Sequence, residues 1–417
     1  MKTRLYPRVA LALWAAAIPL WAQNTAVLPF ANISSESAVK NAASMDWIGE
    51  SIAETLRAAF TARGVLTLER DRITEAYQRL RLRERAELTE ASILKVGEVL
   101  DAEQVVHGTF SFVPAAGGSS GASKGSLKIQ ARVSDRRQLR QSALFEETGA
   151  IEDLATLESH LAWRALTKVA PARAPAESEF RSLRTTVPLD VLEDYIRGLL
   201  APTPEQKEKY FTQAARLDPD FSPPAYELGK IHFERKEYRE AAEWLEHVGP
   251  TENHYREATF FLGYARYQAG DFEGARKAFQ SVAVKVPIST VLNNLGAAES
   301  RLNLPQALDT FRKALDQDPS DPDYHFNVGY ALFKKGDFVA AADRFRAVLD
   351  REPEDQMATL LLGRCLKKQG LRTGKGEASA SDARLQALER LKDTYEELVY
   401  FQLKSILESP PAAGPRQ

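Results

Sequence analysis

The chain has 417 residues, of which 44% are hydrophobic and 27% are charged, a composition typical of folded globular domains rather than of disordered segments. Its 55 Lys and Arg residues nearly balance its 57 Asp and Glu residues, which gives a net charge of −2. This balance argues against a basic surface for nucleic acid, so we expect no nucleic-acid partner. The length predicts two or three domains.

Residues 1–22 have the pattern of a secretory signal peptide. Three basic residues precede an uncharged, mostly apolar stretch from Val9 to Leu20, and the small residue Ala22 marks a cleavage point. The stretch is shorter than the roughly 20 residues that span a bilayer. An uncleaved amphipathic anchor or a buried helix are the alternatives. We expect export to the periplasm or secretion.

Cysteine usage bears on where the exported protein would be located. Cys365 is the only cysteine of the chain, so no intramolecular disulfide is expected. Because no cysteine stands at the end of the signal segment, we also expect no lipid anchor. No later apolar run is long enough to span a membrane, although peripheral association with the cell envelope stays open.

Residues 24–170 alternate between strand and helix patterns, which predicts a small α/β domain. The expected strands are 25–30, 65–68, 104–113, 127–133 and 142–147. The expected helices are 46–63, 73–82, 90–100 and 151–169. The Gly- and Ser-rich stretch 115–125 predicts a flexible hairpin loop. Residues 171–188, rich in Ala, Pro and Ser, have the composition of a linker, because such residues cannot bury enough apolar surface to fold alone.

Beyond the linker the chain repeats itself. An apolar residue followed by glycine recurs at intervals of 33 or 34 residues, at Leu228-Gly229, Leu262-Gly263, Leu295-Gly296, Val328-Gly329 and Leu362-Gly363. A second landmark, an alanine four residues before a Phe or Leu, follows in the first four units, at Ala241/Leu245, Ala275/Phe279, Ala307/Phe311 and Ala341/Phe345. Small residues at the first landmark allow antiparallel helices to approach closely, and the large residues fill the space between them.

This pattern resembles the tetratricopeptide repeat, whose period is about 34 residues. The resemblance implies an all-α superhelical solenoid with five repeats over residues 222–370, the last one irregular. Residues 189–221 resemble a degenerate leading hairpin. After the repeats, 371–381 reads as a loop insertion, 382–408 as one amphipathic helix that caps the open end, and 409–417 as a disordered tail. The predicted fold class is therefore α+β multidomain.

The resemblance also predicts a concave groove lined by the first helix of each hairpin. Its predicted partner-binding residues form an aromatic surface with basic and amide groups, suited to an extended peptide or a partner helix. They are Tyr226, Lys230, Phe233, Phe260, Tyr264, Tyr267, Asn293, Asn294, Arg301, Phe326, Asn327, Tyr330, Phe333, Lys334, Arg364 and Lys367. Each aromatic could instead pack between hairpins. The family's Lys-Asn-Arg clamp for a terminal carboxylate is incomplete, although Asn294 and Asn327 occupy comparable positions.

No catalytic constellation is evident in the sequence. The six His residues lack metal-ligand spacing, and Cys365 lies within a repeat helix. The Gly-rich stretch 117–125 lacks the strand and helix that flank a phosphate-binding loop. We therefore expect no catalytic residues, no metal and no cofactor, and a protein that is not an enzyme.

Residues 25–150 resemble a group of envelope domains that includes the TolB amino-terminal domain and relatives among curli-secretion and flagellar outer-membrane accessory proteins. The resemblance rests on short motifs at 27–30, 46–52, 68–70, 96–102 and 106–108. It implies a unit that acts in assembly within the bacterial envelope. The lipid-anchoring cysteine of the curli-type relatives is absent, and the loop 114–125 is too short and polar to form membrane-spanning hairpins, so pore formation is not expected.

Two functions from different classes are consistent with these patterns. The leading hypothesis is an exported envelope scaffold or adaptor that binds a protein or peptide partner in the concave groove. The alternative is a ligand-sensing module, in which the α/β domain binds a small molecule and the repeats relay its state to a partner.

Overall fold

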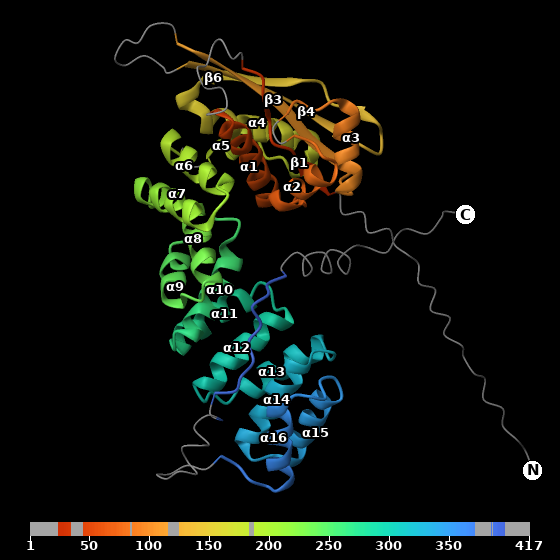
Figure 1. Cartoon of the computed structure of the whole chain (residues 1–417), viewed down its shortest axis with the longest axis vertical. Helices are drawn as coiled ribbons and strands as arrows, with labels where there is room; N and C mark the ends of the chain where they lie inside the picture. Colours follow the sequence, from red (N-terminus) through yellow and green to blue (C-terminus); the bar gives the residue numbers. More distant parts are fainter. Residues whose placement is uncertain are drawn as a thin grey trace, which may run out of the picture.

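The computed structural model describes residues 24–34, 45–83, 86–115, 125–182, 187–371, 385 and 387–396. The predicted signal peptide 1–22, the tail 409–417 and most of the loops 115–125 and 371–381 lie outside these residues. The described residues form an α/β domain followed by an array of helical hairpins, the α+β multidomain class predicted from the sequence. Figure 1 shows the sheet domain at one end of the array.

The α/β domain is built around one long antiparallel strand pair. Its strands are β1 (Thr25–Val27), β2 (Ala31–Asn32), β3 (Gln104–Pro114), β4 (Gly125–Asp135), β5 (Arg140–Gln141) and β6 (Phe145–Ala150). β3 and β4 pair along their full length, β1 and β2 lie parallel to β3 on its other edge, and β5 and β6 pair with β4. The predicted strand 65–68 is wrong apart from a single bridge between Thr25 and Thr67, because the chain enters the next helix at Arg70.

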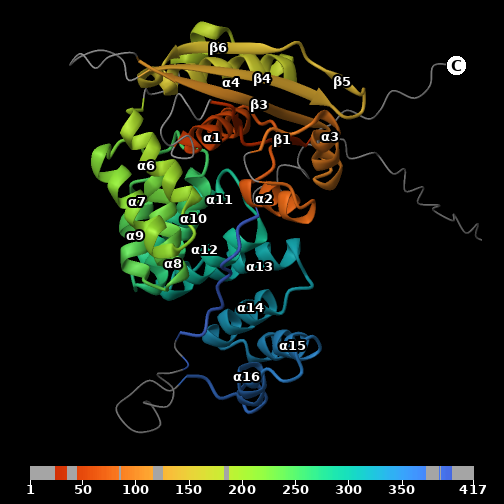
Figure 2. The same ribbon diagram turned by 45° about the horizontal axis from the view of Figure 1, so that its top comes forward.

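Helices cover both faces of this sheet (Figure 2). Successive strand residues point to opposite faces, so neighbours in one strand join different cores. Val27 and Val106 pack with α1 (Trp47–Ala62) and α4 (Leu154–Val169), which follows the short helix η2 (Ile151–Asp153). Ala26 and Val105 pack with α2 (Arg70–Arg79) and α3 (Glu90–Val99).

The described part of the predicted linker packs against α4. It contains the turn η3 (Pro171–Arg173) and the short helix α5 (Glu177–Ser182). The indole Nε1 of Trp163 donates a hydrogen bond to the Pro175 carbonyl oxygen at 3.0 Å, and Phe180 is buried. Phe180 is therefore buried against a surface that the rest of the domain supplies.

The helical array consists of hairpins whose two helices cross at small residues. Its helices are α6 (Leu189–Leu200), α7 (Pro204–Leu217), α8 (Pro223–Glu234), α9 (Tyr238–Glu246), α10 (Tyr255–Gln268), α11 (Phe272–Ala283), α12 (Ser289–Arg301), α13 (Ala307–Gln317), α14 (Pro322–Lys335), α15 (Phe338–Leu349) and α16 (Gln356–Leu366). A Cβ atom on Gly263 would lie 2.8 Å from the Phe279 ring, and one on Gly296 would lie 2.7 Å from the Phe311 ring. Glycine at these positions therefore sets how closely the paired helices approach.

The sheet domain and the start of the array share one hydrophobic core. Ile196 of α6, Phe211 of α7 and Leu228 of α8 belong to the same buried cluster as α1 and α4. Further along the array, the side-chain amide of Asn253 donates a hydrogen bond to the Ala58 carbonyl oxygen at 2.9 Å. The sheet domain thus covers the first hairpins, as the green helices beneath it in Figure 1 show.

A charged cluster lies at this junction. The His254 ring stacks on Tyr226 with 4.6 Å between ring centroids, and its Nδ1 lies 3.3 Å from Glu257. Burial opposes the charged form of His254, but the hydrogen bond and charge of Glu257, together with the charges of Glu69 and Glu252, raise its pKa above the usual value. The pKa of Glu257 is lowered, because the hydrogen bond and charge of His254 outweigh its burial.

Glycine at the helix crossings gives a first prediction. In Gly296→Ala the new methyl group meets the buried Phe311 ring, and such overpacking costs about 1–3 kcal/mol. This exceeds the roughly 1 kcal/mol that alanine contributes to a helix. We expect a lower free energy of unfolding in chemical denaturation. The matched control is Gly363→Ala in α16, where no atom beyond the adjacent residues and the backbone of its own helix lies within 4 Å of the new Cβ; we expect this variant to be as stable as the wild type or more stable.

The junction predicts a pH dependence of stability. A raised pKa of His254 in the folded state means that its contribution is complete below about pH 6.5 and is lost as pH rises through the folded-state pKa. In His254→Gln we expect denaturant midpoints that fall less between pH 6 and pH 8 than in the wild type. His247→Gln, at the exposed end of α9, is the control. An unchanged pH slope in His254→Gln would contradict the assignment.

Candidate partner-binding groove

Residues 387–396 lie along the first helices of the repeats without forming a helix. The predicted capping helix 382–408 is therefore wrong over these residues, and the remainder of it, apart from Leu385, lies outside the described part of the chain. Figures 1 and 2 show the segment as a blue thread that crosses the array from α14 toward α10. We call Leu385 and residues 387–396 the groove segment.

Three asparagines hold the backbone of the groove segment. Asn294 donates from Nδ2 to the Lys392 carbonyl oxygen at 2.7 Å and accepts from the Lys392 amide at 2.9 Å. Asn327 makes the same pair of bonds with Arg390, at 2.7 Å and 2.8 Å. Asn293 also donates to the Arg390 carbonyl oxygen at 2.7 Å. These contacts recognise the polypeptide backbone and do not depend on the side chains of the segment.

The positions of the three asparagine side chains in the repeats explain why their amides need a partner in the groove. Asn294 and Asn327 occupy equivalent places on α12 and α14, each directly before the landmark pair Leu295-Gly296 or Val328-Gly329, and Asn327 Nδ2 also donates to Asn293 Oδ1 at 2.7 Å. All three asparagines are fully buried. A buried amide without partners costs about 1–3 kcal/mol, so these side chains require a polar chain beside them. The backbone of the groove segment supplies it.

The side chain of Arg390 lies between acidic groups and an aromatic ring. Its Nη2 is 2.5 Å from Asp355 and its Nη1 is 3.1 Å from Asp323. Its guanidinium carbon lies 3.7 Å from the centre of the Phe326 ring, within the range of a cation–π contact. Burial opposes the charged form of Asp355, but hydrogen bonds from the Ala358 amide and Arg390 lower its pKa.

Lys392 meets the same acidic edge of the groove. Its Nζ lies 2.6 Å from Asp323 and 2.7 Å from Asp321, and also stands over the Tyr324 ring. Burial disfavours the charged ammonium, yet the hydrogen bonds to Asp321 and Asp323 raise the pKa of Lys392 above its usual value. We call Asp321, Asp323 and Asp355 the acidic rim.

Glu389 contacts a different part of the groove. Its carboxylate accepts a hydrogen bond from the Ser300 hydroxyl at 2.6 Å and lies 3.2 Å from Lys334 Nζ. The Glu389 side chain is 0% exposed, and Lys334 is the basic side chain that contacts it. Burial, followed by the negative charge of Glu389, raises the pKa of the nearby Tyr267 phenol.

Half of the predicted groove residues meet the groove segment. These are Phe260, Tyr267, Asn293, Asn294, Phe326, Asn327, Tyr330 and Lys334. The aromatic pair Phe260 and Tyr395 has 5.2 Å between ring centroids, and the Tyr330 hydroxyl donates to the Leu385 carbonyl oxygen at 2.6 Å.

The other predicted residues have different surroundings. Tyr226 and Lys230 contact each other near the junction with the sheet domain, and Phe233 and Tyr264 form an aromatic cluster. Arg301 stacks on Phe272, and Phe333 is buried against Phe338. Arg364 donates to the Gly370 carbonyl oxygen, and Lys367 is exposed at the end of α16.

The prediction missed the acidic rim. Asp321 and Asp355 cap the N-termini of α14 and α16, and Asp323 lies in the first turn of α14. In sequence they read as ordinary helix-start signals, which fully account for aspartate there. The sequence did contain one sign of the acidic rim. Asp321 and Asp355 recur at the start of successive first helices, and this places them along one edge of the groove.

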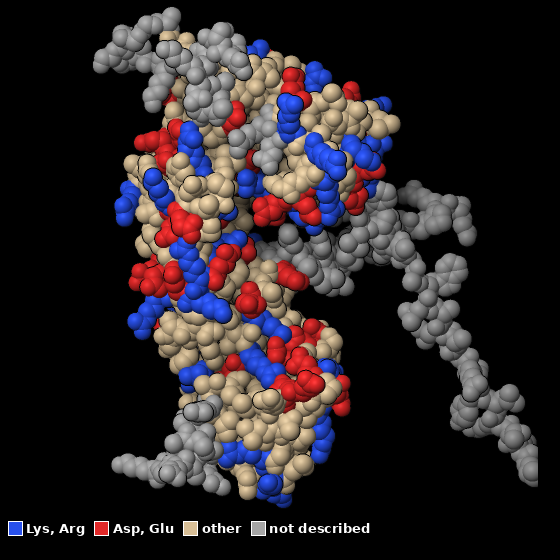
Figure 3. All heavy atoms as spheres, in the orientation of Figure 1, with Lys and Arg blue, Asp and Glu red and all other residues tan. Residues whose placement is uncertain are grey.

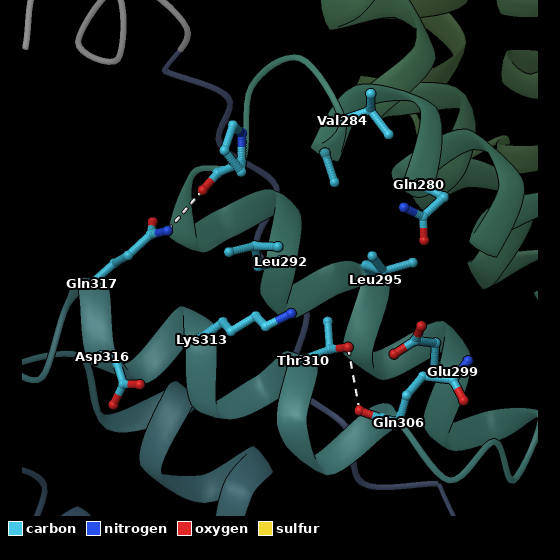
Figure 4. Close-up of a pocket in the computed structure, with 12 residues that line it drawn as sticks. Gln280, Val284, Leu292, Leu295, Glu299, Gln306, Thr310, Lys313, Asp316 and Gln317 are labelled. Carbon is cyan, nitrogen blue, oxygen red and sulfur yellow. Dashed lines mark hydrogen bonds between the residues drawn. The ribbon is translucent and has the colours of Figure 1, made fainter. Parts of the chain in front are cut away.

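A separate pocket of about 650 Å³ lies between α11, α12 and α13 (Figure 4). Leu292, Leu295 and Glu299 of α12 line it, whereas Asn293 and Asn294 of the same helix contact the groove segment. Gln317 donates to the Pro287 carbonyl oxygen at 2.8 Å across one side. The pocket and the groove therefore use different faces of α12.

Other features bear on function. The face of the molecule in Figure 3 carries acidic and basic side chains interspersed, in keeping with the net charge of −2. Within the described ranges, no three His, Cys, Asp or Glu side chains cluster in a way that could hold a metal ion. In the same part of the chain, no helix is both long enough and apolar enough to cross a membrane.

Comparison with known proteins identifies the repeats. A model of the TPR repeat matches residues 303–336, and a tetratricopeptide-repeat model matches residues 251–287 and 331–391. The predicted tetratricopeptide repeats are thereby confirmed, and an array of this kind is a scaffold for protein–protein interaction. No curated protein sequence matches the chain significantly.

Several solved structures resemble the array. YrrB, described as a TPR protein with an unusual peptide-binding site, is 19% identical and has a TM-score of 0.38 over 41% of this chain and 91% of that chain. MamA (41-end) from Desulfovibrio magneticus RS-1 is 23% identical with a TM-score of 0.35, over 38% of this chain and 92% of that chain.

The asparagine contacts predict how the groove segment is held. Asn294→Ala removes both hydrogen bonds to the Lys392 backbone, each worth about 1 kcal/mol. We expect the Lys392 amide to exchange with deuterium at least tenfold faster, while the amides of α15 stay unchanged. Lys367→Ala, at an exposed position away from the segment, is the control. Equal exchange in both variants would contradict the contact.

Proposed function

We propose that this protein is a non-catalytic scaffold of the bacterial envelope, exported through residues 1–22, that holds an extended segment of a partner protein in its repeat groove. One observation carries the proposal. Asn293, Asn294 and Asn327 are buried on first helices and bond to the backbone of an extended chain. Because backbone contacts are common to all sequences, the same amides suit a segment of another protein.

The packing around the groove supports a binding role. The groove segment has no helix or strand of its own, so its backbone depends on the asparagines for hydrogen bonds. Its side chains meet aromatic, acidic and basic groups within a few residues, the mixture that gives peptide-binding surfaces their selectivity.

The α/β domain would dock to a second envelope component. Support comes from the short motifs that resemble envelope domains, because these motifs meet in the core. The Leu28 amide donates to the Val106 carbonyl oxygen at 2.9 Å, and the Phe30 amide donates to that of Gly49 at 3.1 Å. Gly108 lies directly against the Phe30 ring. Residues far apart in sequence thus form one packing unit, as a shared domain type would require.

Proximity labelling tests export and groove binding together. The full-length chain would carry a C-terminal labelling enzyme that is active in the periplasm, and labelled proteins would be identified by mass spectrometry. We expect envelope proteins to be labelled by the wild type. In the double variant Asn293→Ala, Asn327→Ala we expect a subset of them to fall at least tenfold, because the backbone contacts are lost.

Two controls define the outcome of this experiment. Lys277→Ala, at an exposed position of the second helix α11, should retain the wild-type labelling pattern, and a chain lacking residues 1–22 should label only cytoplasmic proteins. If the wild type labels only cytoplasmic proteins, the export proposal is contradicted. If the double variant keeps the wild-type melting temperature and labels the same envelope proteins as the wild type, the groove proposal is contradicted.

A further inference from the structure

The groove is filled by the chain itself, and the segment that fills it displays a defined pattern of side chains. Resting on the proposed function, we infer that the partner segment carries glutamate, arginine, any residue and lysine in the register of residues 389–392, and that the groove segment is an internal competitor for this partner.

Selectivity comes from side chains because the asparagines contact only backbone atoms. In an extended chain, successive side chains point to opposite sides. Arg390 and Lys392, two residues apart, both reach the acidic rim, where Asp323 contacts the two of them. Glu389 points the other way, into the site formed by Ser300 and Lys334. The groove therefore selects two basic residues at alternate positions, preceded by an acidic one.

The charges of the groove exclude the opposite pattern. An acidic side chain at the place of Arg390 would face Asp323 and Asp355, and one at the place of Lys392 would face Asp321 and Asp323. Like charges this close cost free energy, and the cost is greater where the groups are partly buried. The partner is therefore a basic segment and not an acidic tail.

Several contacts that hold the groove segment are partly exposed, which would allow a partner to displace it. Arg390 and Lys392 keep 23% and 22% of their side-chain surface exposed, so their ion pairs are partly screened by water. Among its apolar side chains, Leu388, Leu391 and Tyr395 are only partly buried, whereas Leu385 is buried. The short stretch 372–384 joins the segment to the array. Such tethering gives an effective local concentration on the order of millimolar, so a free peptide must compete with it.

The test measures binding of a fluorescent peptide with the sequence of residues 385–396 to the full-length protein. In the double variant Arg390→Glu, Lys392→Glu the groove segment is repelled by the acidic rim. We expect this variant to bind the peptide at least tenfold more tightly than the wild type. A peptide with glutamate in place of both basic residues should bind the same variant at least tenfold more weakly.

A charge reversal in the groove gives an independent readout. Asp323→Lys should weaken the native peptide at least tenfold and improve the binding of the glutamate-substituted peptide, because Asp323 contacts both basic side chains. Melting temperatures within a few degrees of the wild type would show that each variant is folded. Equal affinities of the two peptides for every variant would overturn the inferred pattern.

The remaining outcomes separate this inference from the proposed function. If the native peptide binds the wild type as tightly as it binds the double variant, the groove segment is not a competitor and the inference fails. A dimeric wild type in light scattering, with segments exchanged between copies, would also overturn it. If the native peptide binds Arg390→Glu, Lys392→Glu equally well with and without Asn327→Ala, the groove does not bind backbone and the proposed function itself fails.

Discussion

Each helical hairpin has an apolar face that it cannot cover by itself, and the rest of the structure follows from how these faces are covered. Between repeats, the neighbouring hairpin covers them, which requires the close crossings at Gly263 and Gly296. At the start of the array, α1 and α4 of the sheet domain cover α6 and α7 within one continuous core. The sheet domain is therefore part of the solenoid's packing, and its position relative to the first repeats is fixed by buried side chains.

On the concave side of the array, buried polar side chains require hydrogen-bond partners. Asn293, Asn294 and Asn327 are completely buried, and their amides need a partner with both donors and acceptors. A backbone in extended conformation supplies both at every residue, whereas a helix uses its own groups internally. The asparagines thus specify the conformation of whatever lies in the groove. The acidic rim and the Lys334 site then specify its side chains.

The repeating hairpins could be predicted from the sequence because their landmark residues are periodic. The conformation of the groove segment could not, because it depends on contacts with distant helices. The glycine and large apolar landmarks recur at 33 or 34 residues, so the hairpins and the asparagines on their inner helices followed directly. Residues 382–408 show leucines at helical spacing, which predicts a helix. The structure instead pairs the Arg390 and Lys392 backbone with asparagine side chains. No local pattern within 382–408 contains the information that α12 and α14 compete for its hydrogen bonds.

The helical pattern of that segment and its extended state need not conflict. The leucines that would form one side of a helix also supply Leu388 and Leu391, which pack against the array in the extended form. Its backbone hydrogen bonds are made either within a helix or to the asparagines, and never to both. A segment with two ways to satisfy the same groups has a smaller free-energy difference between bound and released states than one that would be left unstructured. If the groove segment competes with a partner, its helical pattern would therefore make release from the groove less costly.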